Sequence, residues 1–266
     1  MERQNIFFDV DGTLLDSATH EFPQSAKAAI QSLKQAGHRI FIATGRCYAS
    51  LKRCGLMDAV EWDGYVLSNG QVVMLKDQTL LHEECIDFRA VKQCIHIAAK
   101  HQIALSLISS DDWFMMDDGN EYVKIAHQFL NEVLPHQRPY EGEPIITMLA
   151  YDSRDADYHE FRKIEGLKVI PAESTYADLI VEGVSKADGI KRLCAYFEHE
   201  DYIAFGDSLN DWEMMEHAAL SIAMGQGNEK LKALADFVTR SVNEDGIAYA
   251  VNALGLLNET KDNHIR

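Results

Sequence analysis

The residues with the clearest chemical potential are Asp9 and Asp11, in the pentapeptide Asp-Val-Asp-Gly-Thr that ends the short apolar run 6–10. Such a run, stopping at a turn, is typical of a buried parallel strand. Ligands of open parallel sheets bind at the carboxyl ends of the strands, so this pair is placed where a reaction would occur. Two carboxylates this close raise one of the two pKa values unless a cation or a proton shares the site.

A divalent metal ion would resolve this conflict and leave Asp9 ionised as a nucleophile. Asp11 is then the better candidate to carry a proton and to act as general acid and base. Gly12 permits a tight turn and a close approach of the backbone. The alternative interpretation is an Asx-type turn that merely ends a strand.

A second segment, Thr44-Gly45-Arg46, follows the apolar stretch Arg39–Ala43. The hydroxyl of Thr44 and the backbone N–H of Gly45 could bind an anion at a helix N-terminus. An ordinary N-cap with a glycine in the loop is the alternative. Arg46 could contact a phosphate or pin an inserted cap, although a salt bridge at the helix start would look the same in sequence.

A third segment, residues 206–211 with the sequence Gly-Asp-Ser-Leu-Asn-Asp, follows the apolar run 202–205. Its carboxylates could complete an all-oxygen site of the kind that Mg²⁺ prefers. Alternatively, Ser208 or Asp207 caps the next helix and Asp211 favours its dipole. Lys186, at the start of an earlier helix, could neutralise a bound anion, whereas a lone lysine there is usually solvated.

Taken together, these segments supply the parts of one reaction. A phosphoryl group attacked by a carboxylate needs a nucleophile, an acid for the leaving group, donors for its oxygens, a cation and a metal ion. Each segment follows an expected strand or begins a helix that faces the same edge of the sheet. The combination therefore favours phosphoryl transfer over four unrelated turns.

The elements that must position these residues alternate in the first part of the chain. Strands are expected at 6–10, Arg39–Ala43 and 65–68, with helices between them and a hairpin at 72–82. This order predicts a parallel sheet with right-handed crossovers. The alternation returns after residue 186.

The middle of the chain has a different pattern, with helices expected at 88–100, 121–134 and 155–164 among strands typical of an antiparallel sheet. We therefore expect an α/β fold: a doubly wound, Rossmann-like parallel-sheet core and an inserted α+β domain. The core would comprise residues 1–83 and 182–266, and the insert residues 84–181.

Composition limits the possible partners. The 266 residues include 25 basic and 42 acidic side chains, a net charge of −17, which disfavours nucleic acid as a partner. Five cysteines without CxxC spacing, no signal-peptide pattern and no apolar stretch of about 20 residues predict a cytoplasmic protein without a membrane segment. We expect a monomer or a weak homodimer.

The four segments, in their order along the chain, resemble the four motifs of the haloacid dehalogenase (HAD) superfamily. The insert after the third strand resembles that of the Cof-type, type-IIB branch, and the resemblance covers nearly the whole chain. The pairs Asn69-Gly70 and Met224-Gly225 stand where that branch usually has Asn-Gly and Met-Gly. Gln226-Gly227 departs from the Asn-Ala of many relatives, which we expect to affect only the loop.

The resemblance implies a phosphatase that forms an aspartyl-phosphate on Asp9, with Asp11 protonating the leaving alcohol and then activating water. It also implies Mg²⁺ held by the Asp9 carboxylate, the Asp11 carbonyl and Asp207. The substrate-binding residues would be Gly12, Thr44, Gly45, Arg46, Lys186 and Asn210. Asn210 and Asp211 would hold the phosphate or the water molecules of the metal.

Small phosphorylated metabolites are the implied substrates, with sugar phosphates first and nucleotide or cofactor phosphates open. Residues 84–181 would act as a mobile cap that determines specificity. One alternative is a phosphomutase or phosphotransferase, which passes the phosphoryl group from Asp9 to a hydroxyl other than water. The other is a non-catalytic regulator that binds a phosphorylated metabolite.

Overall fold

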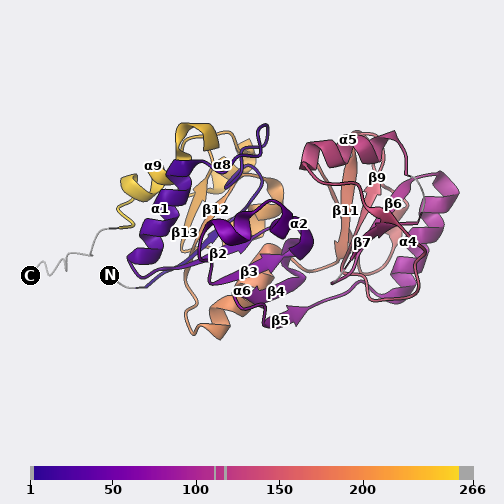
Figure 1. Cartoon of the computed structure of the whole chain (residues 1–266), viewed down its shortest axis with the longest axis horizontal. Coiled ribbons are helices and arrows are strands. Elements are labelled where there is room, and N and C mark those ends of the chain that lie inside the picture. Colours follow the sequence, from indigo (N-terminus) through magenta and orange to yellow (C-terminus); the bar gives the residue numbers. More distant parts are fainter. Residues whose placement is uncertain (1–2, 111, 117–118, 258–266) are drawn as a thin grey trace, which may run out of the picture. The chain divides into compact units, whose positions relative to one another are not determined.

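The computed structural model describes residues 3–110, 112–116 and 119–257 (Figure 1). Its packing divides these residues into two units. The first contains residues 3–45, 55–81 and 185–257, and the second contains residues 46–54 and 82–184. The segment 46–54, which the sequence-based boundaries assign to the core, packs with the second unit.

The first unit is built on an eight-stranded sheet in the order β14-β13-β12-β1-β2-β3-β4-β5. The strands are β1 (Asn5–Phe8), β2 (Arg39–Ala43), β3 (Gly64–Leu67), β4 (Val72–Leu75), β5 (Leu80–Glu83), β12 (Tyr202–Gly206), β13 (Leu220–Ala223) and β14 (Phe237–Val238). The neighbours from β14 to β3 are parallel, and β4 is antiparallel to β3. The chain winds outward from β1 in both directions, so the predicted doubly wound parallel sheet is confirmed.

Helices cover the two faces of this sheet. On one face, α1 (Gln24–Gln35) packs against β2 and against α9 (Gly246–Ala253), as Figure 1 shows. The buried side chains of α1 recur at helical spacing, as the sequence predicts, and Pro23 directly precedes the helix. On the other face, α6 (Lys186–Tyr196), α7 (Trp212–Glu216) and α8 (Glu229–Leu234) share one apolar cluster with the central strands.

The second unit contains a six-stranded sheet in the order β10-β11-β9-β6-β7-β8. Its strands are β6 (Ala104–Ile108), β7 (Trp113–Met115), β8 (His136–Gln137), β9 (Thr147–Tyr151), β10 (Leu167–Pro171) and β11 (Tyr176–Val181). All neighbours are antiparallel except β7 and β8. Its longer helices are α4 (Phe88–His101) and α5 (Glu121–Leu130). The short helix α2 (Tyr48–Arg53) also belongs to the second unit, whereas the next short helix, α3 (Leu56–Ala59), belongs to the first.

Two helices predicted for the insert differ from the structure. The helix expected at 155–164 is wrong: Tyr158 has a φ of 52°, and the Asp157 carboxylate accepts a hydrogen bond from His159 N at 2.9 Å. This local turn competes with helix formation and leaves only a 3₁₀ turn at Phe161–Lys163. The helix expected to reach residue 134 ends at Leu130, because Asn131 takes the left-handed conformation that ends many helices.

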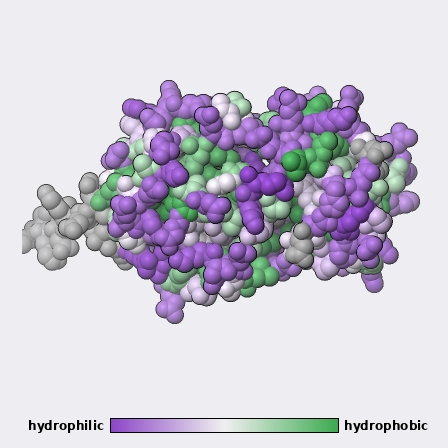
Figure 2. Space-filling view, viewed as in Figure 1, coloured by the Kyte–Doolittle hydropathy of each residue, from purple (hydrophilic) through white to green (hydrophobic). Residues whose placement is uncertain are grey.

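The surface is mostly hydrophilic on the face that Figure 2 shows, with hydrophobic residues in small separate patches. Large exposed hydrophobic side chains include Ile125 and Phe129 on α5, and Val133 and Leu134 just after it. Among the described residues, none of the helices combines the length and the apolar character needed to cross a membrane.

Candidate active site

Asp9 directly follows β1, which lies between β2 and β12 in the sheet. Its backbone N–H donates to the carbonyl of Phe205 at 3.0 Å, which continues the pairing of β1 with β12. The Asp9 side chain is 6% exposed. Because β1 is central, residues at the ends of the strands on both sides are brought towards this carboxylate.

The chain turns sharply after Asp9. Gly12 has a φ of +81°, and its N–H donates to the carbonyl of Leu15 at 2.8 Å. A Cβ atom at Gly12 would lie 2.2 Å from Oδ2 of Asp207, so only glycine fits against this carboxylate. Asp11 precedes the turn and is exposed to solvent, as a general acid needs to be if it is to reach a substrate.

Lys186 lies between two carboxylates. Its Nζ is 2.6 Å from Oδ1 of Asp9 and 2.6 Å from Oδ1 of Asp211, and its side chain is fully buried. The residue begins α6, where Ser185 forms a capping box with Asp188. Burial alone lowers the pKa of a lysine, but the charges of Asp211 and Asp9 outweigh it and raise the pKa of Lys186, so the ammonium group is retained.

Asp211 organises the loop that follows β12. Its Oδ2 accepts hydrogen bonds from the backbone N–H groups of Asp207 at 3.0 Å and Ser208 at 3.1 Å, while Oδ1 binds Lys186. A Cβ atom at Gly206 would lie 2.8 Å from the same carboxylate. Both oxygens of Asp211 are thus committed to holding the loop and the lysine.

Three carboxylates meet at this point. One oxygen from each of Asp9, Asp207 and Asp211 lies within 4.8 Å of the others. Burial, with the charge of Asp211, raises the pKa of Asp9, and burial, with the charge of Asp9, raises that of Asp207. Among the described residues, the buried Oδ1 of Asp207 has no hydrogen-bond partner. These all-oxygen donors and their excess negative charge fit a Mg²⁺ ion, which would lower both pKa values again.

The predicted phosphate-binding residues lie at the ends of neighbouring strands. Thr44 follows β2, its N–H donates to Val66 O at 2.9 Å, and its carbonyl accepts from Asn69 N at 3.0 Å. The side-chain amide of Asn210 donates to Oδ1 of Asn69 at 3.2 Å. A Cβ atom at Gly45 would lie 3.2 Å from that Asn69 amide. Asn69, which the sequence analysis notes only as part of a resemblance, therefore connects the Thr44-Gly45 loop with Asn210.

Arg46 is the one predicted site residue that packs with the second unit. Its guanidinium group binds Oε1 of Glu132 at 3.1 Å, Oγ of Ser50 at 2.9 Å and the carbonyl of Leu130 at 3.3 Å. The structure thus shows the salt-bridge alternative, and contact of Arg46 with a phosphate stays a prediction.

The expectation that Gln226 affects only its own loop is wrong. Its Nε2 donates to the carbonyl of Gly12, and its Oε1 accepts from the N–H of Val242 at 3.2 Å. The side chain therefore joins the turn after Asp9 to the C-terminal part of the unit. The only signal in the sequence is an amide side chain between Gly225 and Gly227. The sequence does not show that Gln226 contacts Gly12, which lies 214 positions earlier.

Comparison with known proteins agrees with this geometry. Residues 6–251 match the family model of the haloacid dehalogenase-like hydrolases. The chain is 31% identical to YkrA of Bacillus subtilis, over 97% of this chain and 100% of that protein. It is 28% identical to the 5-amino-6-(5-phospho-D-ribitylamino)uracil phosphatase YitU of the same species, over 91% of this chain and 94% of YitU.

A solved structure extends the likeness to the fold. The HAD subclass IIB sugar phosphatase BT4131 superposes with a TM-score of 0.83 at 28% identity, covering 95% of this chain and 99% of that one. Both units of the present structure are therefore those of a type-IIB enzyme. The chain belongs to the haloacid dehalogenase-like hydrolases and is a phosphatase of their Cof-type branch.

Proposed function

We propose that this phosphatase is Mg²⁺-dependent and hydrolyses small phosphorylated metabolites, with sugar phosphates as the main class, through an aspartyl-phosphate on Asp9. The observation that carries the proposal is the Asp9 carboxylate, buried against Lys186 and beside the unpartnered Oδ1 of Asp207. Two relatives support the substrate class, since BT4131 is a sugar phosphatase and YitU acts on a phosphoribityl compound.

In the first step, the Asp9 carboxylate attacks phosphorus and the bond between phosphorus and the ester oxygen breaks. Asp11 gives its proton to the departing alkoxide, which leaves as an alcohol. In the second step, Asp11 takes a proton from water, the resulting hydroxide attacks phosphorus, and the bond to Asp9 breaks. Inorganic phosphate is released, and both aspartates return to their starting states.

The surrounding residues prepare Asp9 for this attack. Lys186 holds one oxygen of Asp9 at 2.6 Å and supplies positive charge near the transferring group. The hydroxyl of Thr44, the N–H of Gly45 and the amide of Asn210 would donate to the phosphoryl oxygens. The carboxylates of Asp9 and Asp207 and the Asp11 carbonyl would hold Mg²⁺, with Asp211 binding its water molecules; the ion supplies charge neutralisation at the phosphoryl group.

We further propose that the second unit is the cap and that residues 84–181 select the substrate. A panel of phosphorylated sugars, nucleotides and cofactors, assayed with Mg²⁺, identifies the class that it accepts. A preference for nucleotides over sugar phosphates would contradict the substrate part of the proposal.

The nucleophile is tested by the Asp9→Asn variant with p-nitrophenyl phosphate. We expect phosphate release only with Mg²⁺, and a loss on the order of 10⁴-fold or more in the variant, as for other enzyme nucleophiles. Asp77→Asn, on an exposed turn of the first unit, is the matched control and should keep full activity. Full activity of Asp9→Asn would overturn the assignment.

A further inference from the structure

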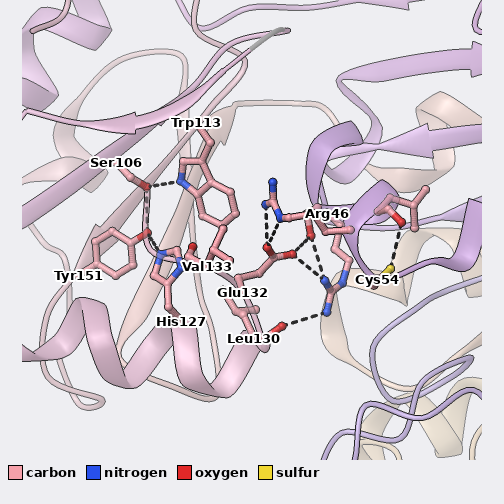
Figure 3. A network of polar contacts seen from close by, with 12 residues as sticks. Arg46, Cys54, Ser106, Trp113, His127, Leu130, Glu132, Val133 and Tyr151 are labelled. Carbon is pink, nitrogen blue, oxygen red and sulfur yellow. Dashed lines mark hydrogen bonds and ion pairs between the residues drawn. The ribbon is translucent and has the colours of Figure 1, made fainter. Parts of the chain in front are cut away.

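Arg46, just before the short helix α2, and two residues within this helix bind a single carboxylate, that of Glu132 (Figure 3). Arg46, Ser50 and Arg53 recur at helical spacing and all bind Glu132. Nη1 of Arg46 lies 3.1 Å from Oε1 of Glu132, and Nη2 of Arg53 lies 2.7 Å from Oε2. The Ser50 hydroxyl donates to the same Oε1. The side chains of Glu132 and Arg46 are 3% and 7% exposed, and that of Arg53 is 37% exposed, so the carboxylate and one of its two guanidinium partners are buried.

The backbone around Glu132 is itself held in place. The N–H of Glu132 donates to the carbonyl of His127 at 2.9 Å, just past the left-handed residue that ends α5. The His127 ring binds the carbonyl of the next residue, Val133, at 2.9 Å through Nδ1. His127 is therefore hydrogen-bonded to the backbone at Glu132 and at the next residue, Val133.

The His127 ring is fixed in turn by a directional chain of hydrogen bonds. A carbonyl can only accept, so Nδ1 carries the hydrogen and Nε2 accepts from the Tyr151 hydroxyl at 2.9 Å. The Tyr151 oxygen accepts from Ser106, whose oxygen accepts from Trp113 Nε1, each at 2.9 Å. Burial lowers the pKa of His127 and keeps the ring neutral, as this chain requires.

Helix α2 depends on this anchor more than a longer helix would. It has six residues, and its N-terminus has no side-chain cap. Isolated helices of fewer than about 12 residues are marginal in water, so contacts with neighbouring elements must stabilise α2. Glu132 binds two side chains of this helix, those of Ser50 and Arg53.

Arg46 is bonded directly to Gly45, which, with Thr44, is proposed to bind the transferring phosphoryl group. We infer that Glu132 is a positioning residue: by holding Arg46 and α2, it orders the Thr44-Gly45 loop for phosphate binding. This inference rests on the proposed function, and it assigns a role in phosphate recognition to a residue that touches neither phosphate nor metal.

The test compares Glu132→Gln with wild type and with Glu160→Gln, an exposed glutamate of the same unit that pairs with Lys163. Hydrogen exchange of the backbone amides reports the order of α2. Two measurements report how well the Thr44-Gly45 loop binds phosphate. The first is the KM and kcat for p-nitrophenyl phosphate, and the second is the dissociation constant of inorganic phosphate in the presence of Mg²⁺, from calorimetry. We expect faster exchange in residues 46–54 and a KM and phosphate dissociation constant on the order of 10-fold higher in Glu132→Gln, since small misplacements near a reacting group cost this much or more.

The kcat value should change less than KM, and Glu160→Gln should match wild type. Faster exchange with unchanged phosphate affinity would overturn the inference, because Glu132 would then be merely structural; unchanged exchange would overturn it as well. If Glu132→Gln does not fold, Arg53→Lys, which keeps the charge and loses the forked geometry towards Glu132, should show the same changes to a smaller degree.

Phosphate binding separates this inference from the proposed function. A wild-type protein that binds phosphate without hydrolysing any ester would contradict the proposed function. If Glu132→Gln weakened phosphate binding in that protein, the positioning role would still stand.

Discussion

The ammonium group of Lys186 lies 2.6 Å from the carboxylate of Asp9, although 177 positions separate the two residues along the chain. The whole second unit, residues 46–54 and 82–184, lies between them in the sequence. Because Lys186 also binds Asp211, it balances part of the charge of three clustered aspartates. The pair is thus part of the electrostatic balance of the site as well as of its chemistry.

Removing this lysine should therefore cost both stability and activity. Replacing it by methionine (Lys186→Met) leaves buried carboxylates without their cation, which typically costs about 3–5 kcal/mol. Urea unfolding at pH 7 in EDTA measures the loss. Lys76→Met, which breaks the exposed pair with Glu61, is the control and should unfold like wild type. Equal stability of the two variants would contradict the role of Lys186.

Position 12 requires glycine for two reasons: its φ is positive, and the Asp207 carboxylate occupies the space that a Cβ atom would need. Gly12 and Gly37 both have positive φ, but a Cβ atom at Gly37 would meet nothing within 4 Å. Gly37→Ala should cost about 1 kcal/mol from backbone strain alone and leave kcat/KM unchanged. Gly12→Ala adds a collision with Asp207, so we expect the response to Mg²⁺ and the activity to be lost. Thermal unfolding with and without Mg²⁺ and steady-state kinetics distinguish the two.

Within the part of the chain that the structure describes, Oδ1 of Asp207 has no hydrogen-bond partner, and we expect the metal ion to bind there. At a Mg²⁺ concentration of about 100 times the dissociation constant, wild type should gain roughly 2.7 kcal/mol of stability. Asp207→Asn should gain little, because an amide is a weaker ligand than a carboxylate. Asp201→Asn, at an exposed position just before β12, should respond like wild type. A full Mg²⁺ response in Asp207→Asn would place the ion elsewhere.

Gln226 should support the turn after Asp9 through its amide hydrogen. In Gln226→Glu, the carboxylate can still accept from Val242 but cannot donate to the Gly12 carbonyl, so two oxygens face each other. Losing one such hydrogen bond should lower kcat/KM about tenfold. Gln31→Glu, at an exposed position in α1, provides the comparison. If both variants have wild-type kinetics, the contact has no role in catalysis.

Acidic pH should loosen the loop that carries Glu132. Burial lowers the pKa of His127 below its ordinary value of 6.5, so the unfolded chain binds a proton more readily than the folded one. Its contribution to stability is therefore complete above about pH 6.5 and is lost as the pH falls towards the folded pKa. The protection factors of the amides in residues 46–54 and 127–133, which correct for the slower intrinsic exchange at lower pH, should fall between pH 7.5 and 5.5 in wild type. His127→Gln should remove most of this pH dependence.

The fold of the first unit and the placement of its acidic residues were largely predictable from sequence. Strand ends rich in Asp, Thr and Gly mark the carboxyl edge of a parallel sheet, and β1, β2 and β12 do bring Asp9, Thr44 and Asp207 to that edge. The sequence predicts that Lys186 neutralises a bound anion, and the structure places its ammonium group between the carboxylates of Asp9 and Asp211. The hydrophobic pattern predicts the strands, and the polar residues that follow each strand then lie at the same edge of the sheet.

The contacts of Arg46 could not be predicted in this way. Its polar partners on α2 are visible as a helical spacing, but Glu132 lies 86 positions away on a loop whose path depends on the left-handed Asn131. The failed helix at 155–164 has a similar cause, since the turn at Tyr158 is decided by one side-chain hydrogen bond. The backbone conformation of one residue, as at Asn131 or Tyr158, leaves no periodic pattern of hydrophobic residues in the sequence.

The strand order also affects how this protein is made. One edge of β1 pairs with β2, which is synthesised soon afterwards, but the other edge pairs with β12, about 200 residues later. At translation rates of ~5–20 residues per second, that edge stays open for about 10 to 40 s while the insert is synthesised and able to fold. On the ribosome, the nascent chain therefore exposes a hydrophobic strand for chaperones to shield, and Asp9 meets Asp207 only when the final quarter of the chain emerges.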